Sequence, residues 1–155
     1  MSLTVYLGID VGSVTTKVAL VDEKGKYIDS YMLRTAGKPV MAVQSGLKEL
    51  FKKALCEYNV QGVGTTGSGR NLAGALVGAD VIKNEITAHA VAASTNVPGV
   101  QTILEIGGQD SKIIMLRDGI VTDFAMNTVC AAGTGSFLDQ QANRLNGKTS
   151  SLYRD

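Results

Sequence analysis

The order of apolar and polar positions predicts three short strands at the start of the chain. Apolar runs of strand length cover residues 4–9, 17–21 and 27–33, and clusters of glycine and charged residues separate them. Three successive strands joined by tight turns predict an antiparallel meander.

The period of the apolar positions changes after Pro39. Apolar residues then recur at intervals of three and four positions to about Tyr58, which predicts a helix with one apolar face. The elements expected next are a strand, a flexible polar turn and a helix capped by Asn84, over residues 60–66, 66–70 and 85–93. Residues 72–82 fit neither period.

The same order of elements returns after Val97-Pro98-Gly99. Strands are expected over 101–106, 112–116 and 120–126, and a helical run follows them to Leu145. The first turn of each half holds glycine, aspartate and serine and ends at a lysine, in GIDVGSVTTK (8–17) and in the shorter GGQDSK (107–112). Such a repeat predicts two related structural units.

Both turns have a composition that suits a nucleotide. Glycines and hydroxyls let backbone N–H groups surround a phosphate, and a carboxylate can hold a magnesium ion. Two such hairpins facing each other would hold the phosphate chain of ATP from both sides, which is most of what phosphoryl transfer requires. In this interpretation Asp10 holds Mg²⁺, and Gln109 or Asp110 positions the attacking water. The other residues expected at the phosphates are Gly12, Ser13, Thr15, Thr16, Lys17, Gly107, Gly108 and Ser111.

The alternative interpretation is that Asp10 and Asp110 are ordinary turn formers whose side chains bond their own backbone. Two further glycine patterns are set aside. Residues 62–67 fit G-x-G-x-x-G, but the first two glycines fall inside the expected strand, so a dinucleotide site is not expected there. Residues 147–149 (GKT) lack the first glycine of a phosphate-binding P-loop, since Ala142 stands in its place.

A cysteine stands directly before another turn of small residues. Cys130 follows the strand over 120–126, and residues 131–135 (AAGTG) open the helical run. Glycines at a helix entrance let backbone N–H groups approach an anion, so a thiolate and a phosphate site would lie side by side. By itself, however, a lone cysteine is most often a small buried apolar residue.

Composition excludes several classes of partner. Apolar residues make up 45% of the chain and charged residues 19%, and the net charge is +1, so neither a nucleic-acid nor a membrane partner is expected. The sequence contains no apolar run of the roughly 18 residues that a membrane-spanning helix needs. Two cysteines, Cys56 and Cys130, without a signal peptide indicate a reducing cytoplasm.

Five ordered segments resemble one known family. The first, residues 8–17, resembles the first phosphate motif of the acetate kinase/sugar kinase/chaperone/actin superfamily. The other four are 66–70 (TGSGR), 84–90 (NEITAHA), 106–112 (IGGQDSK) and 127–135 (NTVCAAGTG). Their order resembles the activator ATPases of 2-hydroxyacyl-CoA dehydratases and the related ATPase subunits of benzoyl-CoA reductases.

This resemblance implies an α/β fold. It predicts an actin-like (ribonuclease H-like) lobe with a mixed sheet over residues 1–97, and the beginning of a second, similar lobe, truncated relative to the family, over 98–155. It also implies a homodimer with one [4Fe–4S] cluster at the subunit interface, held by two cysteines of each protomer. Cys130 matches one ligand, and Gly133, Thr134 and Gly135 would lie near the nucleotide. Cys56 does not match the second ligand, which family members carry beyond the position of Asp155.

The function implied is an ATP-dependent activator that drives a low-potential electron to a CoA-ester dehydratase or reductase. Two alternatives stay open. One is a small-molecule kinase of the same superfold, in which Cys130 is dispensable. The other is a non-catalytic remnant that binds a nucleotide (ATP or ADP) without hydrolysis.

Overall fold

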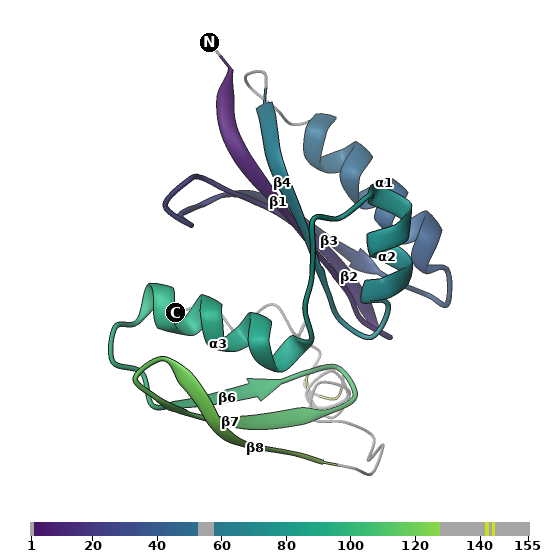
Figure 1. The fold of residues 1–155 in the computed structure, drawn as a ribbon. Coiled ribbons are helices and arrows are strands. Elements are labelled where there is room, and N and C mark those ends of the chain that lie inside the picture. Colours follow the sequence, from purple (N-terminus) through teal and green to yellow (C-terminus); the bar gives the residue numbers. More distant parts are fainter. Residues whose placement is uncertain (1, 53–57, 128–141, 143, 145–155) are drawn as a thin grey trace. The chain divides into compact units, whose positions relative to one another are not determined.

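The structure is a computed structural model that describes residues 2–52, 58–127, 142 and 144. It divides into two compact units, Met1–Ala88 and His89–Asp155, and each is described by itself. The first unit contains β1 (Leu3–Val11), β2 (Thr15–Val21), β3 (Tyr27–Arg34), α1 (Pro39–Lys52), β4 (Tyr58–Thr66), α2 (Arg70–Val77) and β5 (Val81–Ile82) (Figure 1). Helix α3 (Glu85–Asn96) crosses the division, and β6 (Thr102–Ile106), β7 (Ser111–Arg117) and β8 (Ile120–Met126) follow it.

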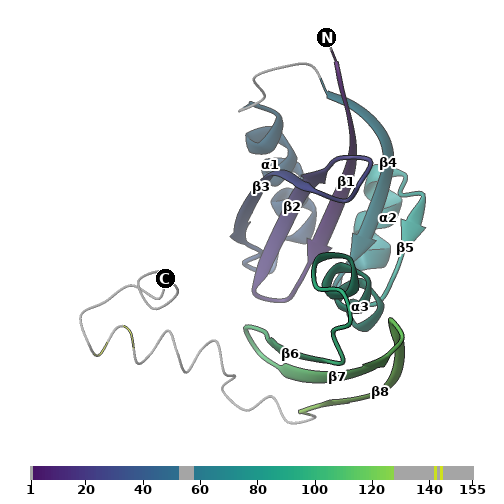
Figure 2. The same ribbon diagram turned by 90° about the vertical axis from the view of Figure 1, so that its left-hand side faces the viewer.

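The first unit is built on a five-stranded mixed sheet. The strand order is β3-β2-β1-β4-β5, in which β1 pairs antiparallel with β2 and parallel with β4. Helices α1 and α2 lie on the same face of this sheet (Figure 2). The mixed α/β sheet expected from the sequence is therefore confirmed.

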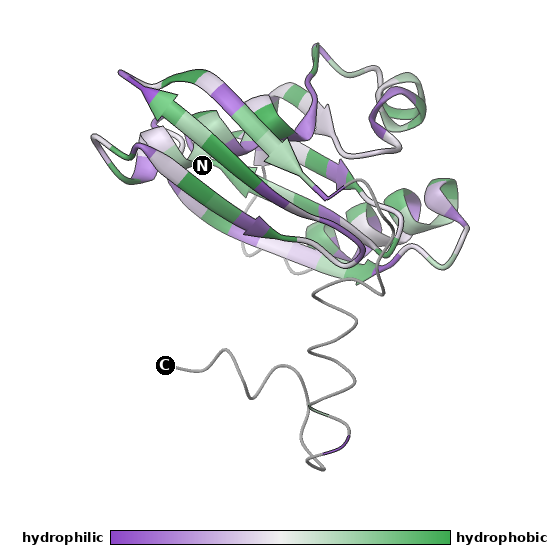
Figure 3. Ribbon diagram, turned by 90° about the horizontal axis from the view of Figure 1, so that it is seen from below, coloured by the Kyte–Doolittle hydropathy of each residue, from purple (hydrophilic) through white to green (hydrophobic). Residues whose placement is uncertain are grey.

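The period of two along β1 separates a core face from an open face. Val5, Ile9 and Val11 are buried, and they belong to a core cluster that includes Leu50 of α1 and Ala73 of α2. Figure 3 shows the resulting bands of hydrophobic and hydrophilic residues along the strands. Because side chains alternate, the residues between the buried positions project from the opposite face, which the two helices do not cover.

One predicted boundary is wrong. The apolar period predicts a helix to about Tyr58, but α1 ends at Lys52 and Tyr58 is the first residue of β4, in parallel register with Leu3. The ring of Tyr58 lies edge-on to that of Phe51, with 6.2 Å between centroids. Tyr58 fits the apolar pattern of the helix because its side chain packs against Phe51 near the end of α1.

Two other local expectations are resolved. Residues 72–82, which fitted neither period, fall mainly in α2 and β5. The predicted cap is confirmed, because the side-chain oxygen of Asn84 accepts a hydrogen bond of 2.8 Å from the backbone N–H of Thr87.

The second unit repeats the meander of the first. Strands β6, β7 and β8 form an antiparallel sheet in that order, as β1, β2 and β3 do. The register shifts between Leu20 and Val21 in the first meander and between Met115 and Leu116 in the second, 95 positions later in each case. The predicted repeat thus extends to the irregularity in the strand pairing.

The lobe boundary expected between residues 97 and 98 stays a prediction, since α3 spans the division between the two compact units. The helical run expected to Leu145 falls largely outside the described residues. Ala142 and Arg144 are described, and both are helical. Within the described part of the chain, no helix is long and apolar enough to cross a membrane.

The buried face of α1 provides a test of the core. We expect Leu50→Ala, at a fully buried position, to lower the free energy of unfolding by about 2–5 kcal/mol, because it leaves a cavity against the sheet. Met41→Ala on the same helix is the control, since Met41 is 58% exposed and its truncation should change that free energy by less than about 1 kcal/mol. Chemical denaturation of both variants measures the difference, and equal losses would contradict the assigned core face.

Candidate functional site

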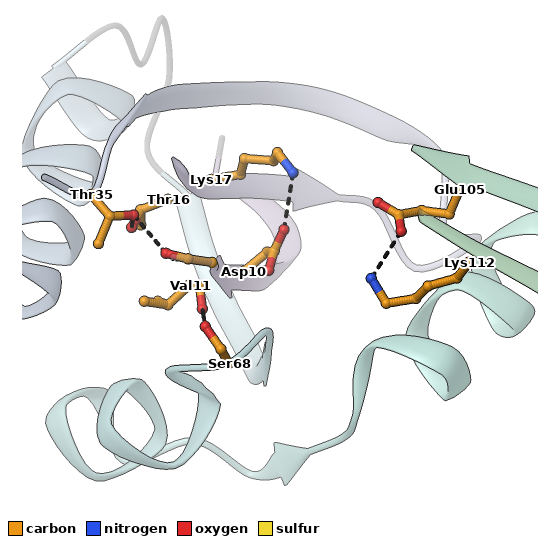
Figure 4. Close-up of polar contacts among 9 residues, drawn as sticks. Asp10, Val11, Thr16, Lys17, Thr35, Ser68, Glu105 and Lys112 are labelled. Carbon is orange, nitrogen blue, oxygen red and sulfur yellow. Dashed lines mark hydrogen bonds and ion pairs between the residues drawn. The ribbon is translucent and has the colours of Figure 1, made fainter. Parts of the chain in front are cut away.

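The first glycine hairpin sets a carboxylate against an ammonium ion on the open face of the sheet. Asp10, near the end of β1, is the register partner of Lys17 on β2. The Nζ of Lys17 lies 3.1 Å from Oδ2 of Asp10 (Figure 4), and the two side chains are 52% and 32% exposed. An ion pair this exposed to water is weak, so either group can exchange its partner for a ligand.

Threonines support the turn of this hairpin from the core side. The N–H of Gly12 donates to the carbonyl of Thr15 at 2.9 Å, and the hydroxyl of Thr35 donates to the carbonyl of Gly12 at 2.8 Å. The hydroxyls of Thr16 and Thr35 lie 2.9 Å apart, and Thr16 is fully buried (Figure 4). The side chain of Thr16 therefore holds the turn in place, and the contact with phosphate predicted for this residue is left to its backbone.

A second turn closes over the end of β1. The carbonyl of Val11 accepts hydrogen bonds from the N–H of Gly69 at 2.8 Å and from the hydroxyl of Ser68 at 3.3 Å (Figure 4). The guanidinium of Arg70 donates to the carbonyl of Gly67 at 3.1 Å. The sequence suggested a flexible polar turn here, whereas the structure shows one bonded to the strand that carries Asp10.

Glycine at position 67 lets the backbone turn pass close to Asp10. A Cβ atom there would lie 2.6 Å from Oδ1 of Asp10 and 2.4 Å from the carbonyl oxygen of Val11, and φ of Gly67 is +91°. Thr66, the register partner of Asp10 on β4, has a buried hydroxyl for which the described part of the chain offers no hydrogen-bond partner. A partly exposed carboxylate with oxygen groups beside it fits a hydrated Mg²⁺ ion, which prefers oxygen ligands and retains several waters.

The second hairpin has the same geometry but buries its lysine. Glu105 on β6 is the register partner of Lys112 on β7. The Nζ of Lys112 lies 2.9 Å from Oε2 of Glu105 (Figure 4) and 3.0 Å from Oδ2 of Asp110. The side chain of Lys112 is only 4% exposed, against 52% for Lys17.

The two turns have equal length, which corrects the expectation that the second is shorter. In each, four residues separate the two members of the last register pair, Val11 with Thr16 and Ile106 with Ser111. The first glycine donates its N–H to the carbonyl of the fourth residue, at 2.9 Å in Gly12 and 2.7 Å in Gly107. Asp10 and Lys17 each precede their equivalents, Glu105 and Lys112, by 95 positions. The structural counterpart of Asp10 is therefore Glu105 rather than Asp110.

The sequence pattern did not single out Glu105 as a site residue, because it stands inside an apolar run. Superposing the two lysines that end the turns would have found it. Asn127 was also missed as a support of the second turn. Its side-chain oxygen accepts the N–H of Ser111 at 2.9 Å, and its own N–H donates to the carbonyl of Ser111 at 3.3 Å.

The remaining predicted site residues fall into two groups. Ser13, Gly108 and Gln109 lie within the two turns, where the sequence placed them. The expected cluster ligand and the glycine turn after it lie outside the described residues: Cys130, Gly133, Thr134 and Gly135. Across the described ranges, no group of three or more His, Cys, Asp or Glu side chains is placed to hold a metal ion.

Comparison with known proteins supports the family resemblance independently. Residues 7–152 match the BadF/BadG/BcrA/BcrD ATPase family. The chain is 38% identical over 152 residues to the (R)-2-hydroxyglutaryl-CoA dehydratase activating ATPase of Acidaminococcus fermentans, covering 97% of this chain and 57% of that protein. The chain thus spans little more than half the length of this relative.

The chain is also similar to solved structures. The crystal structure of component A of the (R)-2-hydroxyglutaryl-CoA dehydratase of A. fermentans has a TM-score of 0.79 at 35% identity, covering 96% of this chain and 57% of that one. The activator of the 2-hydroxyisocaproyl-CoA dehydratase from Clostridium difficile, solved with bound ADPNP, has a TM-score of 0.80 at 31% identity, covering 96% and 55%. The actin-like lobe expected from the sequence is confirmed by these similarities.

The close approach at Gly67 can be tested by adding one methyl group. We expect Gly67→Ala to lower the free energy of unfolding by about 2–5 kcal/mol, because the new Cβ combines an unfavourable φ with contact against Val11 and Asp10. The control is Gly78→Ala, since Gly78 also has a positive φ (+64°) but no atom within 4 Å of the added Cβ, and it should cost about 1–2 kcal/mol. Thermal or chemical unfolding compares the two. The same loss in both variants would show that the close approach adds nothing.

Proposed function

Since the chain belongs to the BadF/BadG/BcrA/BcrD ATPase family, we propose that it contributes the phosphate-binding hairpins of an ATP-hydrolysing activator. The observation that carries this proposal is the exposed pair of Asp10 and Lys17, with the buried hydroxyl of Thr66 in register beside the carboxylate. Phosphoryl transfer depends mainly on positioning and charge compensation, and this pair offers an anion for Mg²⁺ and a cation for phosphate.

In the proposed reaction, the oxygen of water bonds to the γ-phosphorus as the bond to the β-γ bridging oxygen breaks, and the products are ADP and phosphate. Mg²⁺ bound at Asp10 would neutralise charge on the phosphates. The ammonium of Lys17 would leave Asp10 and pair with a phosphate oxygen. Backbone N–H groups of the turn over residues 12–15 would surround the phosphates. The residues proposed to do so are Gly12, Ser13, Thr15 and Thr16 in the first hairpin, and Gly107, Gly108 and Ser111 in the second.

Either Gln109 or Asp110 is proposed to orient the attacking water. The carboxylate of Asp110 lies 3.0 Å from the ammonium of Lys112, so that part of its charge is already compensated. Gln109 is exposed in the middle of the turn, where its amide can both accept and donate a hydrogen bond.

The electron-transfer part of the proposal rests on the family resemblance and on the relatives. The similar proteins include an activating ATPase, two activators of CoA-ester dehydratases and a subunit of a benzoyl-CoA reductase, so a dehydratase or reductase of that kind is the proposed partner. Cys130 would supply one thiolate to a [4Fe–4S] cluster shared by a homodimer in the cytoplasm, with Gly133, Thr134 and Gly135 near the nucleotide. For a one-electron step, about 59 mV corresponds to roughly 1.4 kcal/mol, so ATP hydrolysis can supply substantial reducing power.

Two other functions make different demands on the same residues. A small-molecule kinase of this superfold would transfer the γ-phosphoryl group to an organic acceptor and would not need Cys130. A nucleotide-binding remnant would bind ATP without hydrolysing it. Product analysis and phosphate release therefore distinguish the three.

The ATPase proposal predicts a loss of hydrolysis in Asp10→Asn. In a protein that spans the length of its relatives, we expect kcat/KM for ATP to fall about 100-fold or more, because the carboxylate that would hold Mg²⁺ is lost. Asp29→Asn is the matched control, because Asp29 lies on β3 and accepts a hydrogen bond from the N–H of Ser30. Phosphate release measures both, and undiminished turnover in Asp10→Asn would remove Asp10 from the site.

The cluster proposal predicts different behaviour for the two cysteines. After anaerobic reconstitution of the same longer protein, we expect four iron atoms per dimer in the wild type and none bound as a cluster in Cys130→Ser. Cys56→Ser should retain the cluster. Iron content and visible absorption are the measurements. A cluster that persists in Cys130→Ser would end the assignment of this ligand.

A further inference from the structure

Lys112 joins the two ends of the second turn. Glu105 stands in the strand that enters the turn, and Asp110 is the last of the four turn residues. The ammonium of Lys112 contacts both carboxylates, at 2.9 and 3.0 Å, from a side chain that is 4% exposed. A buried lysine is stable only when its charge is paired and hydrogen-bonded, and these contacts provide that.

The shape of the turn depends on where the Asp110 side chain lies. A Cβ on Gly107 would stand 2.6 Å from Oδ1 of Asp110, so glycine is needed for that carboxylate to fold back over the start of the turn. The same two residues are joined by a backbone hydrogen bond of 2.7 Å from the N–H of Gly107 to the carbonyl of Asp110. Lys112 holds the carboxylate in this place from the strand side.

In the first hairpin, the lysine equivalent to Lys112 is not buried. Lys17 occupies the equivalent register position but is 52% exposed and contacts Asp10 across the strands. Asp110 has no acidic equivalent there, because the fourth residue of the first turn is Thr15. The connection from the lysine to the last turn residue is therefore specific to the second hairpin.

We propose that Lys112 is a positioning residue that fixes the turn over residues 107–110 in the conformation that binds phosphate. The proposal rests on the proposed function for the identity of the ligand, although the fixing of the turn can be measured without any ligand. Lys112 also compensates one of two carboxylates that would otherwise repel a polyanion. Positioning and charge compensation predict different behaviour when both Lys112 and Glu105 are replaced.

The experiment uses three variants of the chain and one control. Lys112→Met removes the cation and leaves two carboxylates. Lys112→Met combined with Glu105→Gln restores the net charge of the three side chains and removes the partly buried carboxylate that has lost its partner, but it does not restore the link to Asp110. Lys112→Arg keeps the charge and donors. Lys52→Met is the control, since Lys52 is 71% exposed and lies 3.9 Å from its partner Glu49.

Two measurements follow each variant by NMR spectroscopy. The first is hydrogen exchange of the Gly107 amide, compared with that of Ile114 in the middle of β7. The second is a titration with Mg²⁺–tripolyphosphate, a probe that contains only the phosphate chain. We expect exchange at Gly107 to rise about tenfold, and affinity to fall about 10- to 100-fold, in Lys112→Met and also in the double variant. Lys112→Arg should recover most of the affinity, and Lys52→Met should match the wild type.

Two results would overturn the proposal. One is a double variant that recovers affinity together with thermal stability, because Lys112 would then act only through charge or folding. The other is unchanged exchange at Gly107 in Lys112→Met. A third result separates the two proposals. If the wild-type chain does not bind the probe, but exchange at the Gly107 amide still rises in Lys112→Met, the positioning role is supported and the proposed function is contradicted.

Discussion

The parallel pairing of β1 with β4 is the contact on which the chemistry of the first hairpin depends. It places Thr66 in register with Asp10, and it makes the chain that leaves β4 pass the end of β1 so closely that residue 67 has no room for a side chain. The carbonyl of Val11 accepts two hydrogen bonds from the passing turn, which satisfies a backbone group at a strand end. The result is a partly exposed carboxylate near the strand end, paired with an exposed cation.

The two hairpins show that burial, rather than backbone geometry, decides what their lysines can do. Both turns connect their strands with four residues and close with the same hydrogen bond, yet Lys17 is 52% exposed and Lys112 only 4%. An exposed ion pair is weak and exchanges readily with ligands, whereas a buried one is costly to separate. One repeated structure therefore supplies an exchangeable cation in the first unit and a fixed one in the second.

Local features of the fold could be predicted from the sequence, and contacts between distant segments could not. The strands of the first meander and the cap at Asn84 involve neighbours in the chain, and both are confirmed. The helix end was placed too late because the contact of Tyr58 with Phe51 imitates a helical period. The role of Glu105 comes from its register with Lys112 on the neighbouring strand, and the turn at Ser68 is held by Val11, 57 positions earlier in the chain. Neither contact leaves a pattern in the local sequence.

Covalent geometry sets a limit on the distance between the two chemistries proposed for this protein. Asn127 is bonded in both directions to Ser111, at the end of the second turn, and Cys130 follows three residues later. Three residues reach at most about 11 Å even when fully extended. Any group held by the Cys130 thiolate must therefore lie within that reach, plus the length of one side chain, of Asn127. This restriction follows from the sequence and from the contacts of Asn127 alone, and it holds whatever conformation the three residues adopt.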